Sequence, residues 1–224
     1  MRKQYDKDLS ELNTLLIEMA AYVERAVSNS LSALQTRDEK LAERVIAQDR
    51  NVDDMERRIE DMCLTLLLRQ QPVAGDLRFI SAALKIITDL ERIGDHAQDI
   101  SEISISMPKE ALTTEMSYIL QMYEESSHMI KTAIDAYITK DEDLANQCIA
   151  HDDIVDKLLI EFRNIIIENL QNKKGNAEEL IDMLQIAKYL ERVGDHAQNI
   201  AEWVIFSITG NHRYYSNPEL YGDV

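Results

Sequence analysis

Hydrophobic residues recur every three or four positions along most of the chain, which is the period of a helix with one buried face. The first run extends from Leu9 to Leu34, and the sequence TRD at positions 36–38 interrupts it. Five similar stretches follow, separated by short polar or glycine- and proline-containing breaks. None of them alternates as a half-buried strand would. The pattern therefore predicts six long helices, the first through Leu34 and the others near residues 38–69, 75–106, 110–138, 141–171 and 176–208.

Two segments of this helical pattern occur twice. TDLERIGDHAQDISEI at 88–103 matches KYLERVGDHAQNIAEW at 188–203 in 10 of 16 positions. DEKLAERVIAQDRNVD at 38–53 matches DEDLANQCIAHDDIVD at 141–156 in 9 of 16 positions. The offsets of 100 and 103 differ by the length change of one connection, where insertions are tolerated. The chain is thus predicted to be an all-α tandem duplication with two three-helix bundles side by side, comprising residues 1–107, residues 108–209 and a C-terminal tail, 210–224.

Composition and charge narrow the range of partners. The formal net charge is −17, which argues against nucleic acid, because phosphate backbones are bound through Lys and Arg. It is compatible with cations or with basic surfaces on partner proteins. Cys63 and Cys148 lie alone in helical patterns, so no disulfide framework is predicted. No run is long and apolar enough to span a bilayer, and the N-terminus lacks a signal-peptide core. We expect a cytoplasmic protein.

Acidic residues form narrow stripes on two helices of the first copy. Positions i, i+4, i+7 and i+11 share one side of a helix. Asp49, Asp53, Glu56 and Glu60 have this spacing, and Glu91, Asp95 and Glu102 share another stripe, with Asp99 beside it. Both stripes are expected on a flank or outer surface, away from the core. Like charges one turn apart destabilise a helix, and a cation held between the two stripes would offset this.

The second copy carries a poorer version of the same stripes. It keeps Asp152 and Asp156 on its second helix and Glu191 and Asp195 on its third, whereas Asn199 stands where the first copy has Asp99. Leu159 and Arg163 replace Glu56 and Glu60. Carboxylate oxygens suit ions such as Mg²⁺, Ca²⁺, Mn²⁺ or iron, so a weaker or smaller second site is expected. A merely solvated acidic face is the alternative, and the sequence leaves both open.

The remaining residues of the repeated motif suggest supporting roles. His96 and its counterpart His196 point about 100° away from the preceding aspartates, so we expect them at an interface or behind a ligand. Arg92 and Arg192 are each expected to pair with a neighbouring carboxylate, and Gly94 and Gly194 to allow close helix approach. The chain shows no phosphate-binding glycine loop and no nucleophile placed with a base. No catalytic or cofactor-binding residue is therefore predicted.

The duplicated unit, the acidic pairs and above all LERIGDHAQDI and LERVGDHAQNI resemble the PhoU family over residues 5 to about 208. QQPVAGDLR at 70–78 also resembles that family's loop into the third helix. The resemblance implies a metal-binding regulator, not an enzyme, commonly a homodimer. The family's acidic motifs carry over to Glu91, Asp95, Asp99, Glu191 and Asp195, with Asn199 departing from the pattern. The metal could be iron, zinc, manganese, magnesium or calcium.

The resemblance also implies partners and a pathway. They are the ATPase subunit of the phosphate ABC transporter and the sensor histidine kinase of the phosphate regulon, so contact with membranes is through these complexes only. The regulator would restrain uptake and repress the phosphate-starvation response when phosphate is plentiful. Two alternatives stay open: a PhoU-like accessory of another ion or phosphate transporter, and a carboxylate-bridged metallohydrolase, which would need an open metal position and a substrate pocket.

Overall fold

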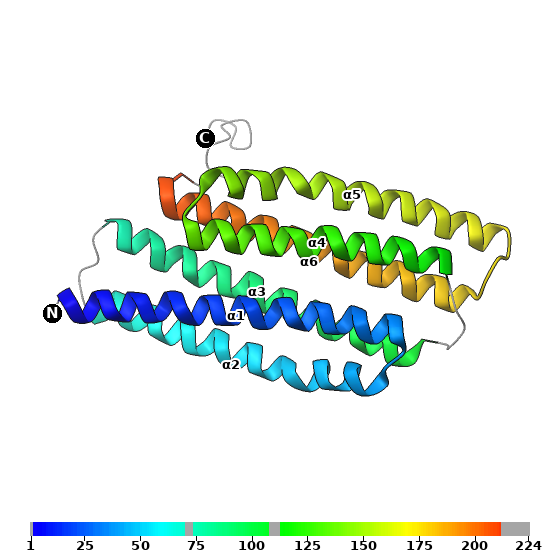
Figure 1. Ribbon diagram of the computed structural model, residues 1–224, viewed down its shortest axis with the longest axis horizontal. Helices are drawn as coiled ribbons and strands as arrows, with labels where there is room; N and C mark the ends of the chain where they lie inside the picture. The colour runs from blue at the N-terminus through cyan, green and yellow to red at the C-terminus, as the bar shows by residue number, and fades with distance from the viewer. Residues whose placement is uncertain (1, 70–73, 108–112, 212–224) are drawn as a thin grey trace, which may run out of the picture.

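Six long helices make up the protein in the computed structural model, which describes residues 2–69, 74–107 and 113–211 (Figure 1). The predicted all-α fold is confirmed, and every described helix boundary lies within a few residues of its expected place. The predicted boundary between residues 107 and 108 and most of the tail lie outside the described residues. The helices are α1 (Arg2–Thr36), α2 (Glu39–Arg69), α3 (Ala74–Ser106), α4 (Thr113–Thr139), α5 (Glu142–Gln171) and α6 (Ala177–Thr209).

The same short turn joins the first two helices of each repeat. Arg37 and Lys140 both have positive φ, 57° and 54°, and each is followed by an aspartate. Asp38 accepts a hydrogen bond from the backbone N–H of Leu41, and Asp141 accepts from the N–H groups of residues 143 and 144. These side chains satisfy backbone donors that a helix start leaves unpaired. The sequence T-[RK]-D-E therefore encodes one turn twice.

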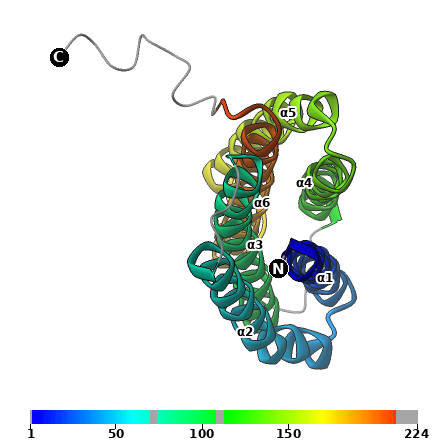
Figure 2. The same cartoon turned by 90° about the vertical axis from the view of Figure 1, so that its left-hand side faces the viewer.

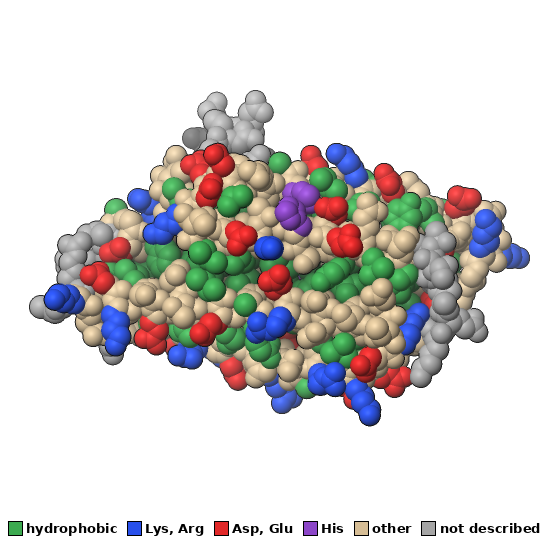
Figure 3. Space-filling model, viewed as in Figure 1, with side chains coloured by type: hydrophobic (Ala, Val, Ile, Leu, Met, Phe, Trp, Pro, Cys, Tyr) green, Lys and Arg blue, Asp and Glu red, His purple; other side chains and the backbone are tan. Residues whose placement is uncertain are grey.

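The helices form two layers. α2, α3, α6 and α5 lie side by side in a curved layer, and α1 and α4 cover its concave face (Figure 2). Within each repeat all three helices contact one another, and α3 packs against α6 and α1 against α4 across the repeats. On the face formed by α1 and α4, hydrophobic side chains follow the line between the two helices, with charged side chains on either side (Figure 3).

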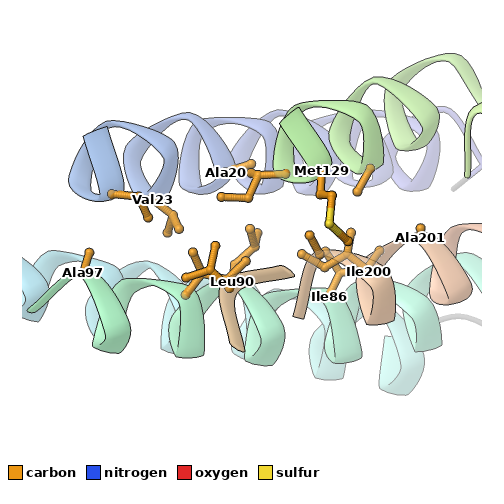
Figure 4. Close-up of a cluster of buried hydrophobic side chains, with 14 of the residues drawn as sticks. Ala20, Val23, Ile86, Leu90, Ala97, Met129, Ile200 and Ala201 are labelled. Atoms are coloured by element: carbon orange, nitrogen blue, oxygen red, sulfur yellow. The ribbon is translucent and has the colours of Figure 1, made fainter. Parts of the chain in front are cut away.

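The two repeats share one hydrophobic core. Val23 of α1, Leu90 of α3, Met129 of α4 and Ile200 of α6 are all fully buried and meet between the layers (Figure 4). Because the apolar faces of both repeats close on the same core, neither bundle buries its hydrophobic side chains alone. No described helix is long and apolar enough to cross a membrane.

Candidate functional site

The acidic stripes of α2 and α3 face each other along the line where these helices meet. We call this region the first seam, which comprises Asp49, Asp53 and Glu56 of α2 and Glu91, Asp95 and Asp99 of α3. Asp49 is close enough to Asp95 and Asp99 for their charges to act on it, and Glu91 is acted on by Asp95, Glu56 and Asp53. The structure thus brings together residues from two separate stretches of sequence, as the stripe analysis predicted.

Close helix packing explains why these carboxylates are partly withdrawn from water. Gly94 lies where α3 meets α2, and a Cβ atom there would lie 3.2 Å from Cγ1 of Val52 and 3.6 Å from Oδ1 of Asp49. The expectation that the motif glycine permits close approach is confirmed. Because the helices are this close, carboxylates on their flanks are covered by the neighbouring helix and held near one another.

The pKa values of the first seam reflect this crowding. Burial, followed by the charges of Asp95, Asp53 and Asp99, raises the pKa of Asp49 to about 6. Burial and the charge of Asp95 raise the pKa of Glu91 to about 7, against the opposing effect of the Arg92 guanidinium. Both raised pKa values mean that neither water nor a nearby cation fully stabilises the negative charges of these carboxylates.

Arg92 supplies only part of that compensation. Its Nη1 donates to Oδ2 of Asp95 at 3.0 Å, and its Nε lies 3.4 Å from Oε2 of Glu91. The predicted pairing of this arginine with a neighbouring carboxylate is therefore confirmed. The same prediction is wrong for Arg192, which makes no ion pair with a carboxylate of the described residues. Its guanidinium lies 5.9 Å from the centre of the Tyr189 ring instead.

α5 and α6 form an equivalent second seam. It comprises Asp152 and Asp156 of α5 with Glu191 and Asp195 of α6. Burial, followed by the charges of Asp195, Asp156 and Glu191, raises the pKa of Asp152 to about 6. Gly194 repeats the role of Gly94, since a Cβ atom there would lie 3.5 Å from Oδ1 of Asp152.

Among the described residues, two carboxylate oxygens of the second seam find no hydrogen-bond partner. They are Oδ1 of Asp152 and Oε2 of Glu191, and both are buried. The other oxygen of Glu191 accepts a hydrogen bond from the Lys188 ammonium. Buried acceptors without donors are costly, so these oxygens are suited to a cation.

The predicted location of the stripes was only partly right. The angular count predicted a flank or outer surface, and the side chains of Asp53 and Asp95 are indeed 34% and 33% exposed. However, the side chain of Glu91 is only 18% exposed, and Glu191 as a whole is 8% exposed. The count considered each helix alone, whereas the adjacent helix covers part of each stripe.

The two histidines of the motif lie at the junction of the repeats, as expected, and not in the seams. Nδ1 of His196 lies 2.9 Å from Oδ1 of Asp89, and the His96 ring stacks on Tyr189 with centroids 5.3 Å apart. Burial and the nearby His196 lower the pKa of His96 to about 4, so this imidazole is neutral at physiological pH. The two histidine rings lie 5.6 Å apart.

Asn199 also belongs to this junction. Its side-chain amide donates to Asp89 at 3.3 Å. Asp99, its counterpart, lies close enough to Asp49 for its charge to act there and is also 3.5 Å from the His96 ring. Asp89 was not singled out in the sequence, because its counterpart in the second repeat is Tyr189 and the duplicated pattern therefore gives no signal there.

The seams provide oxygen donors without a closed coordination site. Across the described ranges, no three histidine, cysteine, aspartate or glutamate side chains are arranged so that they could hold a metal ion as they stand. Several carboxylates share each seam, the pKa values of Asp49, Glu91 and Asp152 are raised, and two buried oxygens accept no hydrogen bond from the described residues. The donor chemistry fits a hard or borderline cation, and the side chains would have to rotate toward it.

Comparison with known proteins gives a consistent result over nearly the whole chain. A profile of the PhoU domain matches residues 16–104 and again residues 119–204. A phosphate-specific transport system accessory protein PhoU homolog from Clostridium acetobutylicum is 37% identical, with 93% of this chain and 96% of that protein covered. A Thermotoga maritima homolog is 32% identical, with 93% and 90% covered.

Comparison with solved structures gives the same family. The crystal structure of PhoU from Pseudomonas aeruginosa superposes with a TM-score of 0.89 at 30% identity, covering 92% of this chain and all of that one. The phosphate transport system regulatory protein PhoU from Streptococcus pneumoniae gives a TM-score of 0.87 at 26% identity, covering 93% and 98%.

Proposed function

The chain belongs to the PhoU family, and we propose from this that it is the accessory protein of a phosphate-specific transport system. The observation that carries the proposal is the match of both repeats to the PhoU domain, together with relatives named for this role over almost their full length. The match includes the segments that form both seams.

We propose further that it acts as a regulator and has no enzymatic activity. It would work in the cytoplasm as an adaptor between the ATPase subunit of the phosphate ABC transporter and the sensor histidine kinase, repressing the starvation response when phosphate is plentiful. The named Streptococcus pneumoniae neighbour is described as a regulatory protein, which supports this role. A homodimer is proposed as the working form.

The seams are proposed to bind divalent cations. Asp49, Asp53, Glu91, Asp95 and Asp99 would hold the ion or ions of the first seam. Asp152, Asp156, Glu191 and Asp195 would hold those of the second. Asn199 would contribute only if its side chain left Asp89. The raised pKa values and unsatisfied oxygens support this proposal. Bound cations would neutralise the carboxylates and hold neighbouring helices together, which is a structural role.

The regulatory role can be tested with a phosphate-starvation reporter at high phosphate. Cells deleted for the gene should express the reporter, and wild type should restore repression. A variant carrying Glu91→Ala, Asp95→Ala, Glu191→Ala and Asp195→Ala, expressed at wild-type levels, should fail to repress. If this variant represses fully, the seams are not needed for regulation.

A reporter that stays silent in the deletion strain would favour an accessory of another transporter. Genomic neighbourhood separates these cases independently, since genes of a phosphate ABC system beside this one favour the regulator and a lone permease gene favours the accessory. Turnover of phosphoester substrates with added Mn²⁺, abolished by the four substitutions, would instead support the metallohydrolase alternative.

A further inference from the structure

The second seam ends in a surface that has no parallel in the first repeat. Moving along α5 and α6 away from Asp156 and Glu191, a groove of about 340 Å³ lies between the two helices. Its lining residues are Leu159, Ile160, Arg163, Leu184, Gln185 and Lys188. We define the α5–α6 patch as Leu159, Ile160, Arg163, Leu184 and Lys188 of this lining together with Ile181, which stands three positions before Leu184 on α6.

The duplication supplies an internal reference for this patch. With offsets of 103 for α5 and 100 for α6, the corresponding first-repeat residues are Glu56, Arg57, Glu60, Ser81, Leu84 and Thr88. In the first repeat, the hydroxyl of Thr88 donates to Glu56 at 3.4 Å across α2 and α3. A polar contact between two helices has thus been replaced by an apolar groove in the same framework.

Two large aliphatic side chains of the patch face solvent. Ile160 is 52% exposed and Ile181 is 57% exposed, whereas their counterparts are an arginine and a serine. Leu159 and Leu184 line the groove and are half-buried against the core. Exposed aliphatic residues clustered around a groove are typical of a surface that another molecule covers.

The charges at the groove indicate what kind of molecule fits. Arg163 is exposed, and its guanidinium makes no ion pair with any residue in the described part of the chain. Lys188 lies on the opposite wall and already bonds Glu191. The chain carries a net charge of −17, and the seams on the same face are acidic. An acidic flank on the bound segment would therefore be attracted here and repelled from the seams.

The dimensions favour a helix. Ile181 and Lys188 are two turns apart on α6, about 10 Å at 1.5 Å per residue. The groove together with the adjoining Ile181 therefore forms a patch of this length, which accepts an amphipathic helix through apolar side chains at i, i+3 or i+4, and i+7. We propose that the α5–α6 patch binds an amphipathic helix of a partner protein, with aliphatic side chains in the groove and a carboxylate on Arg163.

The proposal does not depend on the phosphate-response role, because binding can be measured with the purified full-length chain. Two fluorescent peptides of about 14 residues, or four helical turns, would share one leucine ridge and carry either Glu or Lys on both flanks. Fluorescence anisotropy should show the Glu-flanked peptide binding about tenfold or more tightly than the Lys-flanked one, the equivalent of one unit in log Kd.

Substitutions that copy the first repeat provide the decisive variants. Ile181→Ser with Ile160→Ser should weaken the Glu-flanked peptide about tenfold. Arg163→Glu should reverse the preference between the peptides. Leu64→Ser is the matched control, because Leu64 is a 45% exposed leucine of α2 and its loss should leave binding unchanged. Circular dichroism melts of all variants confirm folding.

Several outcomes overturn the proposal. One is equal binding of the two peptides, or no binding of either. Another is binding by the Ile160→Ser/Ile181→Ser variant as tight as that of wild type. Dissociation of a wild-type dimer by these substitutions in sedimentation velocity would assign the patch to a second copy of the chain. Loss of binding to phosphatidylglycerol vesicles would assign it to a membrane surface.

Discussion

The two seams share one framework and differ in what it carries. Each has a glycine at the closest approach of its helices, two aspartates on the second helix of the repeat, and a glutamate and an aspartate on the third. Beyond this common part the first seam continues with Glu56 and Glu60, whereas the second continues with Leu159 and Arg163. The comparison separates backbone packing, which both repeats retain, from side-chain chemistry, which has diverged at one end.

The junction between the repeats shows the same separation. His96 and His196 occupy corresponding positions, yet His96 stacks on Tyr189 and His196 bonds Asp89. The partners differ because residues 89 and 189 differ. The internal symmetry is therefore a property of the helices, and each repeat has its own polar contacts.

The largest loss of stability should come from substitutions in the hydrophobic core. Phe162 is fully buried and stacks on Tyr118 with centroids 5.6 Å apart, and its counterpart in the first repeat is Ile59. Phe162→Ala should reduce the free energy of unfolding by about 3–5 kcal/mol and Ile59→Ala by about 2–5 kcal/mol. Denaturant unfolding followed by circular dichroism and Trp203 fluorescence measures both.

Because both repeats close on one core, each of these variants should unfold in a single transition seen by both probes. Two separated transitions in Phe162→Ala would show that the repeats fold independently, and would contradict the shared core.

A smaller effect is expected from cation binding. Mn²⁺ at about 100 times its Kd should stabilise the wild type by about 2.7 kcal/mol. This corresponds to a Tm increase of about 5–10 °C for a chain of this size. Glu91→Gln with Asp95→Asn should remove more of this increase than Glu191→Gln with Asp195→Asn, because the first seam contains more carboxylates. Differential scanning calorimetry measures the shift.

The exposed Asp54, on the same helix as Asp49, provides the control as Asp54→Asn and should keep the full gain. A Tm that is the same with and without Mn²⁺ in the wild type would rule out a structural role for the cation. If the two double variants lose the same part of the Mn²⁺-induced Tm increase, the prediction that the first seam binds the cation more strongly than the second is wrong.

The pH dependence of the metal-free protein follows from the raised pKa values. Asp49 at about 6, Glu91 at about 7 and Asp152 at about 6 hold protons in the folded state that the unfolded state releases nearer 4. The native state thus binds more protons over this range, so stability should fall as pH rises from about 4 to about 7. Thermal melts in chelator at pH 5, 6, 7 and 8 should show this.

Asp49→Asn should make the fall in stability with pH less steep by removing one titrating group of the first seam. Asp152→Asn should do the same for the second seam. Asp54→Asn should leave the pH dependence of stability unchanged. Mn²⁺ affinity should change in the opposite sense and increase with pH, because bound carboxylates must be deprotonated. A metal-free stability that rises from pH 5 to pH 8 in wild type, but not in Asp49→Asn, would contradict the raised pKa values.

The smallest difference concerns the two glycines. Replacing a helical Gly by Ala stabilises by about 1 kcal/mol when nothing is in the way. At Gly194 the nearest atom to a new Cβ would be Sδ of the flexible Met129 at 3.4 Å, whereas at Gly94 it would be Cγ1 of Val52 at 3.2 Å. Gly194→Ala should therefore be neutral to stabilising, and Gly94→Ala less favourable by about 1 kcal/mol.

Adding Val52→Ala to Gly94→Ala should remove the clash, which a double-mutant cycle detects as a favourable coupling. If the effects of the two substitutions on stability are additive, the contact with Val52 is not what makes alanine unfavourable at position 94.

Much of the fold could be predicted from the sequence because its signals are local. The apolar period and breaks such as TRD at 36–38 depend on residues close together in the chain, and they led to six helices with nearly correct ends. The internal repeat was found by direct comparison of two segments of sequence. The pairing of Asp49 and Asp53 with Glu91 and Asp95 could also be predicted, because two antiparallel helices joined by a short loop must lie side by side.

The tertiary structure decided what each side chain meets. How far Glu91 and Glu191 are covered depends on the approach of a neighbouring helix that an angular count on one helix cannot include. The same approach contributes to the raised pKa of Glu91. The bond between Asp89 and His196 depends on contact between helices of different repeats. The solvent-facing position of Ile160 and Ile181 depends on how α5 and α6 pack in the fold. The sequence by itself determined the helices and their repetition, because helical periodicity is local, whereas burial and charge environment are set by packing between elements.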